Sequence, residues 1–188
     1  MTIEEPNFTL IEKEQAYELR LYQPKVIAEV LVEGDMRVAS SRGFRLIADF
    51  IFGNNTAQSG QGKKISMTAP VSIEARAERV SMTAPVGIQQ KSDGWRVCFV
   101  MPKEYTLASL PKPNNPLVMI KQLPEQKFAV IRFSGLVNEE KMSKKVAELK
   151  CWIERKKLKT IANPELARYN PPWTLPFLRR NEVMVEIE

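Results

Sequence analysis

The chain has 188 residues, of which 44% are hydrophobic and 27% are charged, a composition typical of a single soluble domain spanning residues 1–188. It contains no histidine. Serine or cysteine nucleophiles activated by histidine, His-ligated zinc and His-ligated haem are therefore excluded.

The two cysteines, Cys98 and Cys151, have neither the spacing of a zinc motif nor the number needed for a disulfide framework. The N-terminal segment is acidic and has no apolar stretch like that of a signal peptide, and no run of about 18 apolar residues occurs. We therefore expect a cytoplasmic protein with reduced thiols and no membrane span.

The net charge is +6, and many of the basic residues lie in the segment 139–159 together with glutamates. Such mixed charge is typical of a solvated helix face. Basic residues interleaved with aromatics, which would suit a nucleic acid, are not evident. We expect no nucleic-acid partner, and an anionic small ligand is compatible with this charge.

The first elements in chain order are two strands and a helix. Residues 16–32 are rich in β-branched and aromatic side chains and are divided at Gln23-Pro24, which predicts a β-hairpin. Apolar residues spaced by three and four then predict a helix over 36–52, ended by Gly53. A polar loop follows over 54–64.

A short repeat comes next, because residues 65–71 (ISMTAPV) return almost unchanged at 80–86 (VSMTAPV). It predicts two matched strands that end in a proline bend. Residues 95–101 alternate as a strand, with Trp95, Val97, Phe99 and Met101 on one face. Residues 118–123 and 127–135 are predicted to form a further strand pair.

A second helix is predicted to begin after Asn138, a suitable N-cap, and to run to about Leu158. The tail ends in an alternating strand containing Val183, Val185 and Ile187. Each half of the chain thus has a strand, a long helix and more strands. This order predicts an α+β domain of mostly antiparallel strands with internal pseudo-twofold symmetry.

The first predicted helix carries the best signal for a ligand site. Its C-terminal half is apolar nearly all round, so one stripe can face the sheet while Ser41, Arg45, Ala48 and Phe52 form a second stripe. A groove of small residues with a cation at one end suits a flat apolar ligand that bears a carboxylate. Alternatively, the helix is simply buried between strands.

The other candidates have structural interpretations as well. Both cysteines are expected to be small buried packing residues. Met67 and Met82, equivalent in the repeat, could line an adaptable pocket or fill the core. A rigid Pro171-Pro172 turn is expected to pack Trp173, and the alternative places one of the two arginines that follow, 179 and 180, at a pocket rim.

Several segments, in a shared order, resemble the SOUL/haem-binding protein family along nearly the whole chain. They are Tyr17-Glu18-Leu19-Arg20, the doubled Met-Thr-Ala-Pro-Val, residues 97–102 (VCFVMP), 110–113 (LPKP), 133–135 (FSG), 169–172 (YNPP) and 179–183 (RRNEV). The resemblance implies a distorted antiparallel β-barrel made of two pseudo-twofold-related halves, each with one long helix. It extends to the ligand-sensing domains of some multidrug-responsive transcription regulators.

The resemblance also implies a small amphipathic ligand, namely haem or another porphyrin, in an apolar cleft beside the first helix. Basic side chains would lie near its propionates. The residues at the implied binding site are Ser41, Arg42, Phe44, Arg45, Ala48 and Tyr169. No residue is assigned as a metal ligand or as catalytic, because no histidine is present to ligate iron.

Two alternatives to a non-enzymatic tetrapyrrole binder stay open. The first is a ligand-sensing or interaction module for other amphipathic molecules or a protein partner, since a fold does not fix a function. The second is an enzyme that modifies a tetrapyrrole, for example by removing its metal. Such chemistry needs a base at the macrocycle, and Asp49 is the one candidate on the first helix.

Overall fold

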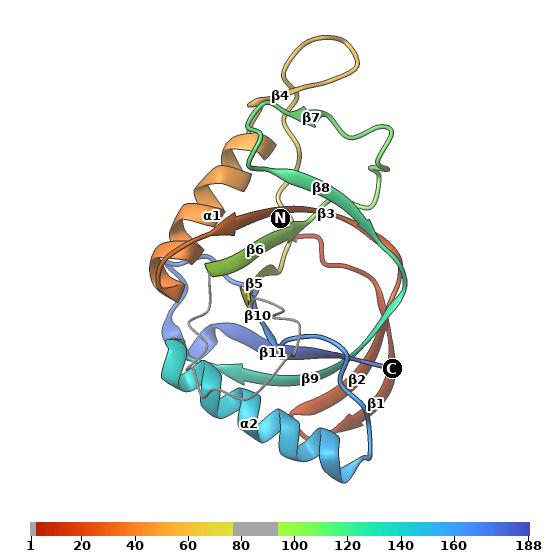
Figure 1. The fold of residues 1–188 in the computed structure, drawn as a ribbon, viewed down its shortest axis with the longest axis vertical. Coiled ribbons are helices and arrows are strands. Elements are labelled where there is room, and N and C mark those ends of the chain that lie inside the picture. The colour runs from red at the N-terminus through yellow and green to blue at the C-terminus, as the bar shows by residue number, and fades with distance from the viewer. Residues whose placement is uncertain (1–2, 77–93) are drawn as a thin grey trace, which may run out of the picture.

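The computed structural model describes residues 3–76 and 94–188. Nine antiparallel strands form one curled sheet, and two helices, α1 (Met36–Ile51) and α2 (Glu139–Arg155), cover its outer face (Figure 1). In spatial order the strands are β1 (Phe8–Glu14), β2 (Tyr17–Tyr22), β9 (Gln126–Ser134), β11 (Arg180–Ile187), β10 (Glu165–Arg168), β5 (Val71–Arg76), β6 (Gly94–Val100), β3 (Lys25–Val32) and β8 (Met119–Leu123). The predicted α+β class and barrel-like sheet are confirmed.

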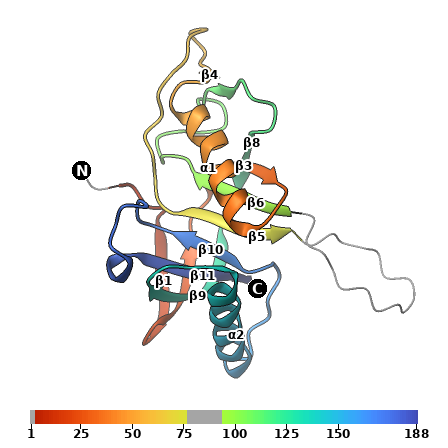
Figure 2. The same ribbon diagram turned by 90° about the vertical axis from the view of Figure 1, so that its left-hand side faces the viewer.

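The predicted division into two similar halves is also visible in the strand order. In one half the chain runs β3–α1–β5–β6, and β6 lies between β3 and β5. In the other half it runs β9–α2–β10–β11, and β11 lies between β9 and β10. The halves meet where β5 pairs with β10, and α1 and α2 lie on the same side of the molecule (Figure 2).

The predicted hairpin over 16–32 is wrong, because β2 and β3 do not pair with each other. Strand β2 pairs with β1 and β9, whereas β3 pairs with β6 and β8. The predicted pairing of 118–123 with 127–135 fails in the same way, since β8 pairs with β3 and β9 with β2 and β11.

The four strands instead form one bent ladder. The register that pairs Tyr22 with Gln126 in β2–β9 continues unchanged in β3–β8, and it sets Pro24 opposite Pro124. A proline has no N–H to donate, so the ladder is interrupted on both strands at the same point. The sheet bends there, and its inner face becomes concave (Figure 1).

Both helices begin at the predicted positions, and Asn138 is the predicted N-cap of α2. The Asp35 side chain accepts a hydrogen bond from Val38 N at 2.8 Å, and α1 ends just before Gly53, whose φ of 123° favours glycine. The Asn138 side chain accepts one from Lys141 N at 2.9 Å. Helix α2 ends at Arg155, three residues before the predicted Leu158.

Three short elements complete the described chain. Strands β4 (Asn55–Thr56) and β7 (Lys112–Pro113) pair beyond the end of α1, and the 3-10 helix η1 (Pro176–Leu178) precedes β11. No helix in the described ranges is both long and apolar enough to cross a membrane.

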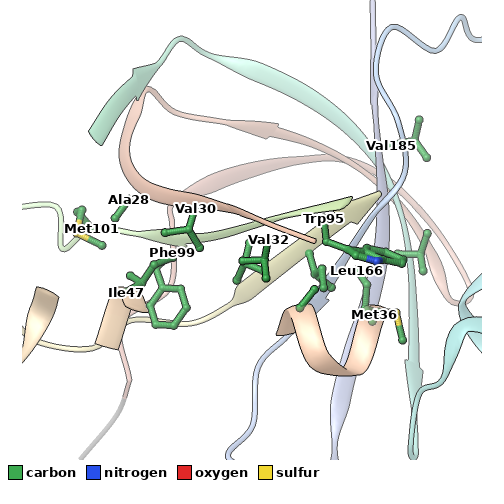
Figure 3. Close-up of a cluster of buried hydrophobic side chains, with 14 of the residues drawn as sticks. Ala28, Val30, Val32, Met36, Ile47, Trp95, Phe99, Met101, Leu166 and Val185 are labelled. Atoms are coloured by element: carbon green, nitrogen blue, oxygen red, sulfur yellow. The ribbon is translucent and has the colours of Figure 1, made fainter. Parts of the chain in front are cut away.

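The main core lies between the helices and the outer face of the sheet (Figure 3). As predicted, Trp95, Val97, Phe99 and Met101 all join this core. Gly43 allows α1 to lie close to β6, because a Cβ atom there would be 2.6 Å from a methyl group of Val97.

The predicted repeat is only partly described. The strand predicted over its first copy is wrong, because no strand spans 65–70 and β5 begins only at Val71, so Pro70 precedes a strand and does not end one. The second copy, 80–86, and with it Met82, lies outside the described residues. Met67 is half-buried and packs against the main core.

Two predictions about buried side chains are wrong, while that for Cys98 is confirmed. Cys151 is exposed, because it lies on the solvent side of α2 next to the buried Trp152. Trp173 is 83% exposed. The turn that carries it is held through its backbone, since the Arg179 guanidinium donates hydrogen bonds to the carbonyls of Pro172 and Thr174, and the indole is left in solvent.

Candidate functional site

Four of the predicted binding residues lie along one flank of α1. Ser41, Phe44, Arg45 and Ala48 recur at intervals of three and four, and we call these four the α1 flank. Ala48 is buried, whereas Ser41 and Arg45 are exposed. The Phe44 ring packs on Phe99 with 5.4 Å between ring centroids, yet 37% of the residue is exposed.

Arg42 is also exposed but lies about 100° further round the helix than Ser41. No carboxylate of the described residues lies within 4 Å of either Arg42 or Arg45. Among the described residues, the arginines that form ion pairs are Arg20, Arg96 and Arg180. All three lie on the concave face of the sheet. The α1 flank therefore combines an exposed aromatic ring with cationic groups that have no anionic partner.

Arg168 adds a third such cation, which the sequence analysis missed. It ends β10, is half-buried, and donates from Nη1 to the Ser40 hydroxyl of α1 at 3.0 Å. Among the described residues it too lacks a carboxylate within 4 Å. Burial and the nearby positive charge of Arg179 lower the pKa of Arg168, so an added anion beside it would be stabilised.

Tyr169, the sixth predicted residue, lies apart from the α1 flank on the concave face. Its hydroxyl donates to Glu182 Oε2 at 2.7 Å, and the guanidinium of Arg180 lies 3.7 Å from its ring centroid. Burial, reinforced by the negative charge of Glu182, raises the pKa of Tyr169. The phenol is therefore neutral and already engaged.

The concave face carries a buried network that we call the arginine–glutamate cluster: Glu18, Arg20, Tyr169, Arg180 and Glu182. Arg20 donates to Glu182 through two nitrogens, at 2.7 and 3.0 Å, and to Glu18 at 2.7 Å. Arg180 donates to Glu182 at 2.9 Å. All five residues belong to the motif segments at 17–20, 169–172 and 179–183, so these segments meet in one network.

This cluster ties together strands that are not neighbours. Arg20 lies on β2 and Glu182 on β11, and β9 separates the two strands. Burial opposes the ionisation of Glu182, but hydrogen bonding and the charge of Arg20 outweigh it and hold the pKa of Glu182 below its usual range. In the sequence, charged residues alternate with apolar ones over 17–22. This pattern indicated a strand but did not identify the partners of the charged residues.

Beside the cluster lies a cavity of about 160 Å³, which we call the central hollow. Arg96 on its wall pairs with Glu74 at 2.6 Å and with Glu29 at 3.3 Å. The residues that line it include Tyr22, Lys25, Ile27, Cys98, Gln126, Phe128, Glu165 and Met184. The hollow therefore mixes aromatic and aliphatic walls with several charges.

Neither thiol lies at the α1 flank. Cys98 lines the central hollow, and burial raises its pKa to about 12, so it is a protonated thiol. Cys151 lies on α2. With histidine absent from the sequence, the α1 flank presents apolar and cationic groups and no imidazole or thiol.

Solved structures share this fold at low sequence identity. The crystal structure of the EcmrR C-terminal domain has a TM-score of 0.67 and 10% identity, over 92% of this chain and 96% of that chain. An uncharacterized conserved protein from Listeria innocua has a TM-score of 0.66 and 12% identity, over 93% of each chain. A hydrolase from Listeria innocua has a TM-score of 0.60 and 12% identity, over 95% of this chain and 94% of that chain.

At these identities the likeness establishes the fold alone. Among curated proteins, no match to the chain was found. The profile of the SOUL heme-binding protein family matches residues 3–186, which is nearly the whole sequence. The chain therefore belongs to the SOUL heme-binding protein family.

Proposed function

We propose that this protein binds haem or a related porphyrin along the α1 flank, with no histidine ligand to the iron. Family membership supports the ligand class. The observation that carries the placement is the exposed ring of Phe44, bordered by arginines that have no carboxylate partner in the described chain. A porphyrin has the complementary chemistry, since it combines a flat apolar surface with two carboxylates.

Each residue of the flank has a defined part in this proposal. Phe44 and the small side chain of Ala48 provide apolar contact for one face of the macrocycle. The guanidinium of Arg45, or of Arg42 at the adjacent position, pairs with a propionate. Arg168 is placed beside α1 by its hydrogen bond to Ser40 and supplies a further cation for the second propionate.

Haem iron would supply redox and ligand-binding chemistry when the group is bound, but the proposed affinity does not come from the iron. Tyr169 and Cys98 are on the concave face, and Cys98 is protonated. Apolar contacts and ion pairs are the same for haemin and for metal-free protoporphyrin. We therefore expect the two affinities to agree within about tenfold, or about 1.4 kcal/mol.

The direct test is titration of the purified protein with haemin and with protoporphyrin, followed by absorbance and by quenching of tryptophan fluorescence. We expect saturable binding with a dissociation constant below about 10 μM for both ligands, equivalent to about 7 kcal/mol. The absence of saturable binding by either ligand at this level would overturn the proposal.

Two variants locate the site. Arg45→Glu should weaken both ligands alike, because it replaces a propionate partner with a repelling carboxylate. Arg155→Glu makes the same charge change on the exposed face of α2 and is the matched control, with binding expected to be unchanged. Phe44→Ala should weaken binding by about tenfold through lost apolar contact. Equal effects of Arg45→Glu and Arg155→Glu would show a general charge effect and reject the placement.

A further inference from the structure

Lys25 occupies an unusual position at the wall of the central hollow. It opens β3 directly after Pro24, at the bend of the sheet. Its Nζ atom lies 4.5 Å from the ring centroid of Tyr22 and 5.5 Å from that of Phe128. Both rings are buried, so the amine rests against two aromatic faces inside the curl of the sheet.

Three of the carboxylates around Lys25 pair with other cations. Glu74 and Glu165 pair with Arg96, at 2.6 and 3.8 Å, and Glu29 pairs with both Arg96 and Lys121. Glu186 also lines the hollow, and its charge acts on Lys25 from beyond 4 Å. Among the described residues, no carboxylate lies within 4 Å of the Lys25 amine. Lys25 is half-buried. A lysine partly withdrawn from water normally has an acidic partner, because transfer of an unpaired ammonium toward a protein interior is costly.

Burial consequently favours the neutral amine. It lowers the pKa of Lys25, although the negative charge of Glu165 opposes the change. Contact with the two rings also favours the ammonium form, but burial outweighs it. The unprotonated amine is the nucleophile in carbonyl chemistry, and a lowered pKa gives Lys25 a larger unprotonated share at a given pH than an ordinary surface lysine has.

The hollow has the size and the acid group that carbonyl chemistry at this amine needs. A cavity of about 150 Å³ accepts a benzene-sized molecule, and this one is about 160 Å³. Ile27 and Met184 provide apolar wall, and the buried Gln126 Oε1 atom has no hydrogen-bond partner within residues 3–76 and 94–188. Burial raises the pKa of Glu165, so its carboxyl group retains a proton more readily than an exposed one.

We propose that Lys25 is a reactive amine that forms a reversible imine with small aldehydes entering the central hollow. Its nitrogen lone pair attacks the carbonyl carbon, and proton transfer gives a neutral carbinolamine. Glu165 then protonates the hydroxyl, the C–O bond breaks, and one water leaves. The resulting iminium returns a proton to the Glu165 carboxylate. No oxidant or reductant takes part, and hydrolysis reverses the sequence.

The experiment is trapping with benzaldehyde and sodium borohydride, which delivers hydride to the imine carbon and leaves a stable benzyl group on nitrogen. Peptide mapping by mass spectrometry then measures the labelled fraction of each lysine. We expect Lys25 to be labelled at least about tenfold faster than Lys63. Lys63 is the matched comparison, because it lies 5.1 Å from the Tyr105 ring but is exposed.

Three controls separate this site from general lysine reactivity. Lys25→Met should remove the fast label, while Lys63→Met should leave it unchanged. In wild-type protein unfolded in urea the preference for Lys25 should vanish, which tests the role of the fold without relying on a variant. An aldehyde too large for the hollow, pyrenecarboxaldehyde, should label exposed lysines and spare Lys25. Labelling of Lys25 no faster than Lys63 in the folded protein would overturn the proposal.

Discussion

Two groups of charged side chains lie side by side on the concave face, and they differ in how completely their polar atoms are paired. In the arginine–glutamate cluster, both oxygens of Glu182 accept hydrogen bonds from Arg20, and they also accept from Arg180 and Tyr169. Next to it, the amine of Lys25 lies against two aromatic rings and forms no hydrogen bond or ion pair with a side chain of the described residues. The same sheet thus carries one saturated group, in which the Glu182 carboxylate is fully hydrogen-bonded, and one unsaturated group, in which the Lys25 amine has no such partner.

The difference indicates separate roles for the two groups. A saturated buried network leaves no donor or acceptor for a ligand, and it joins strands that are otherwise held only through β9. An unsaturated group beside a cavity conflicts with the requirements of a stable core, and such conflicts concentrate at functional sites. The cluster is therefore interpreted as structural, and the central hollow as a place for chemistry.

The largest expected effect comes from breaking the cluster. Glu182→Gln keeps the shape of the side chain but leaves the buried Arg20 and the half-buried Arg180 without their shared carboxylate. We expect the free energy of unfolding to fall by about 3–5 kcal/mol in urea denaturation. The control Glu140→Gln removes an exposed carboxylate paired with Lys144 on α2 and should cost less than about 0.5 kcal/mol. A loss below about 1 kcal/mol in Glu182→Gln would contradict the structural role.

Acid should weaken the same cluster. The pKa of Glu182 is lower in the folded protein than in the unfolded chain, so the unfolded chain binds protons first as the pH falls. The stabilisation is present above about pH 5 and is lost on acidification below it. Urea denaturation at pH 3 to 6 should therefore give a steeper pH dependence for wild type than for Glu182→Gln. Parallel curves would mean that other carboxylates govern acid unfolding.

The central hollow should respond with the opposite sign. Burial raises the pKa of Glu165 in the folded protein, although Lys25 and Arg96 oppose the change, so its ionisation at neutral pH costs stability. Glu165→Gln removes this cost, and we expect the free energy of unfolding at pH 7 to rise by roughly 1 kcal/mol. The gain should disappear as the pH is lowered toward 4. A clear loss of stability at pH 7 would place Glu165 in a saturated network like that of Glu182.

The elements of the fold were predictable because their signals are local. Asp35 and Asn138 begin the helices, Gly53 ends the first one, and alternation at 95–101 identifies both faces of β6. Strand pairing was not predictable from the same information. The short link at Pro24, between β2 and β3, resembles a hairpin turn in the sequence. The pairing of β2 with β9 and of β3 with β8 shows instead that the chain passes from one half of the sheet to the other at this link.

The contacts between polar side chains were not predictable from the sequence either. Arg20 and Glu182 are 162 positions apart, and Arg168 is 128 positions from Ser40, so no spacing rule connects them. The sequence placed Ser41, Arg45 and Ala48 on one helical stripe, and the family resemblance added Phe44, but whether this flank is exposed depends on how α1 packs on β6. Tyr169 was assigned to the same cleft through family resemblance, and the structure instead joins it to Glu182 on the concave face.

The smallest expected effect tests whether the two faces act separately. Cys98→Ser changes a wall of the central hollow, while the proposed porphyrin site lies on the other side of the sheet. Because the Cys98 thiol is buried and protonated, it is a poor ligand for iron, so haemin affinity in the same titration should change by less than about twofold. Cys151→Ser, at the exposed thiol of α2, is the matched control and should be equally neutral. If haemin binding collapsed in Cys98→Ser while protoporphyrin binding and the Arg45→Glu variant were unaffected, the ligand would be held by a thiolate within the curl of the sheet. The concave face would then hold the tetrapyrrole, and the α1 flank would be an ordinary solvated surface.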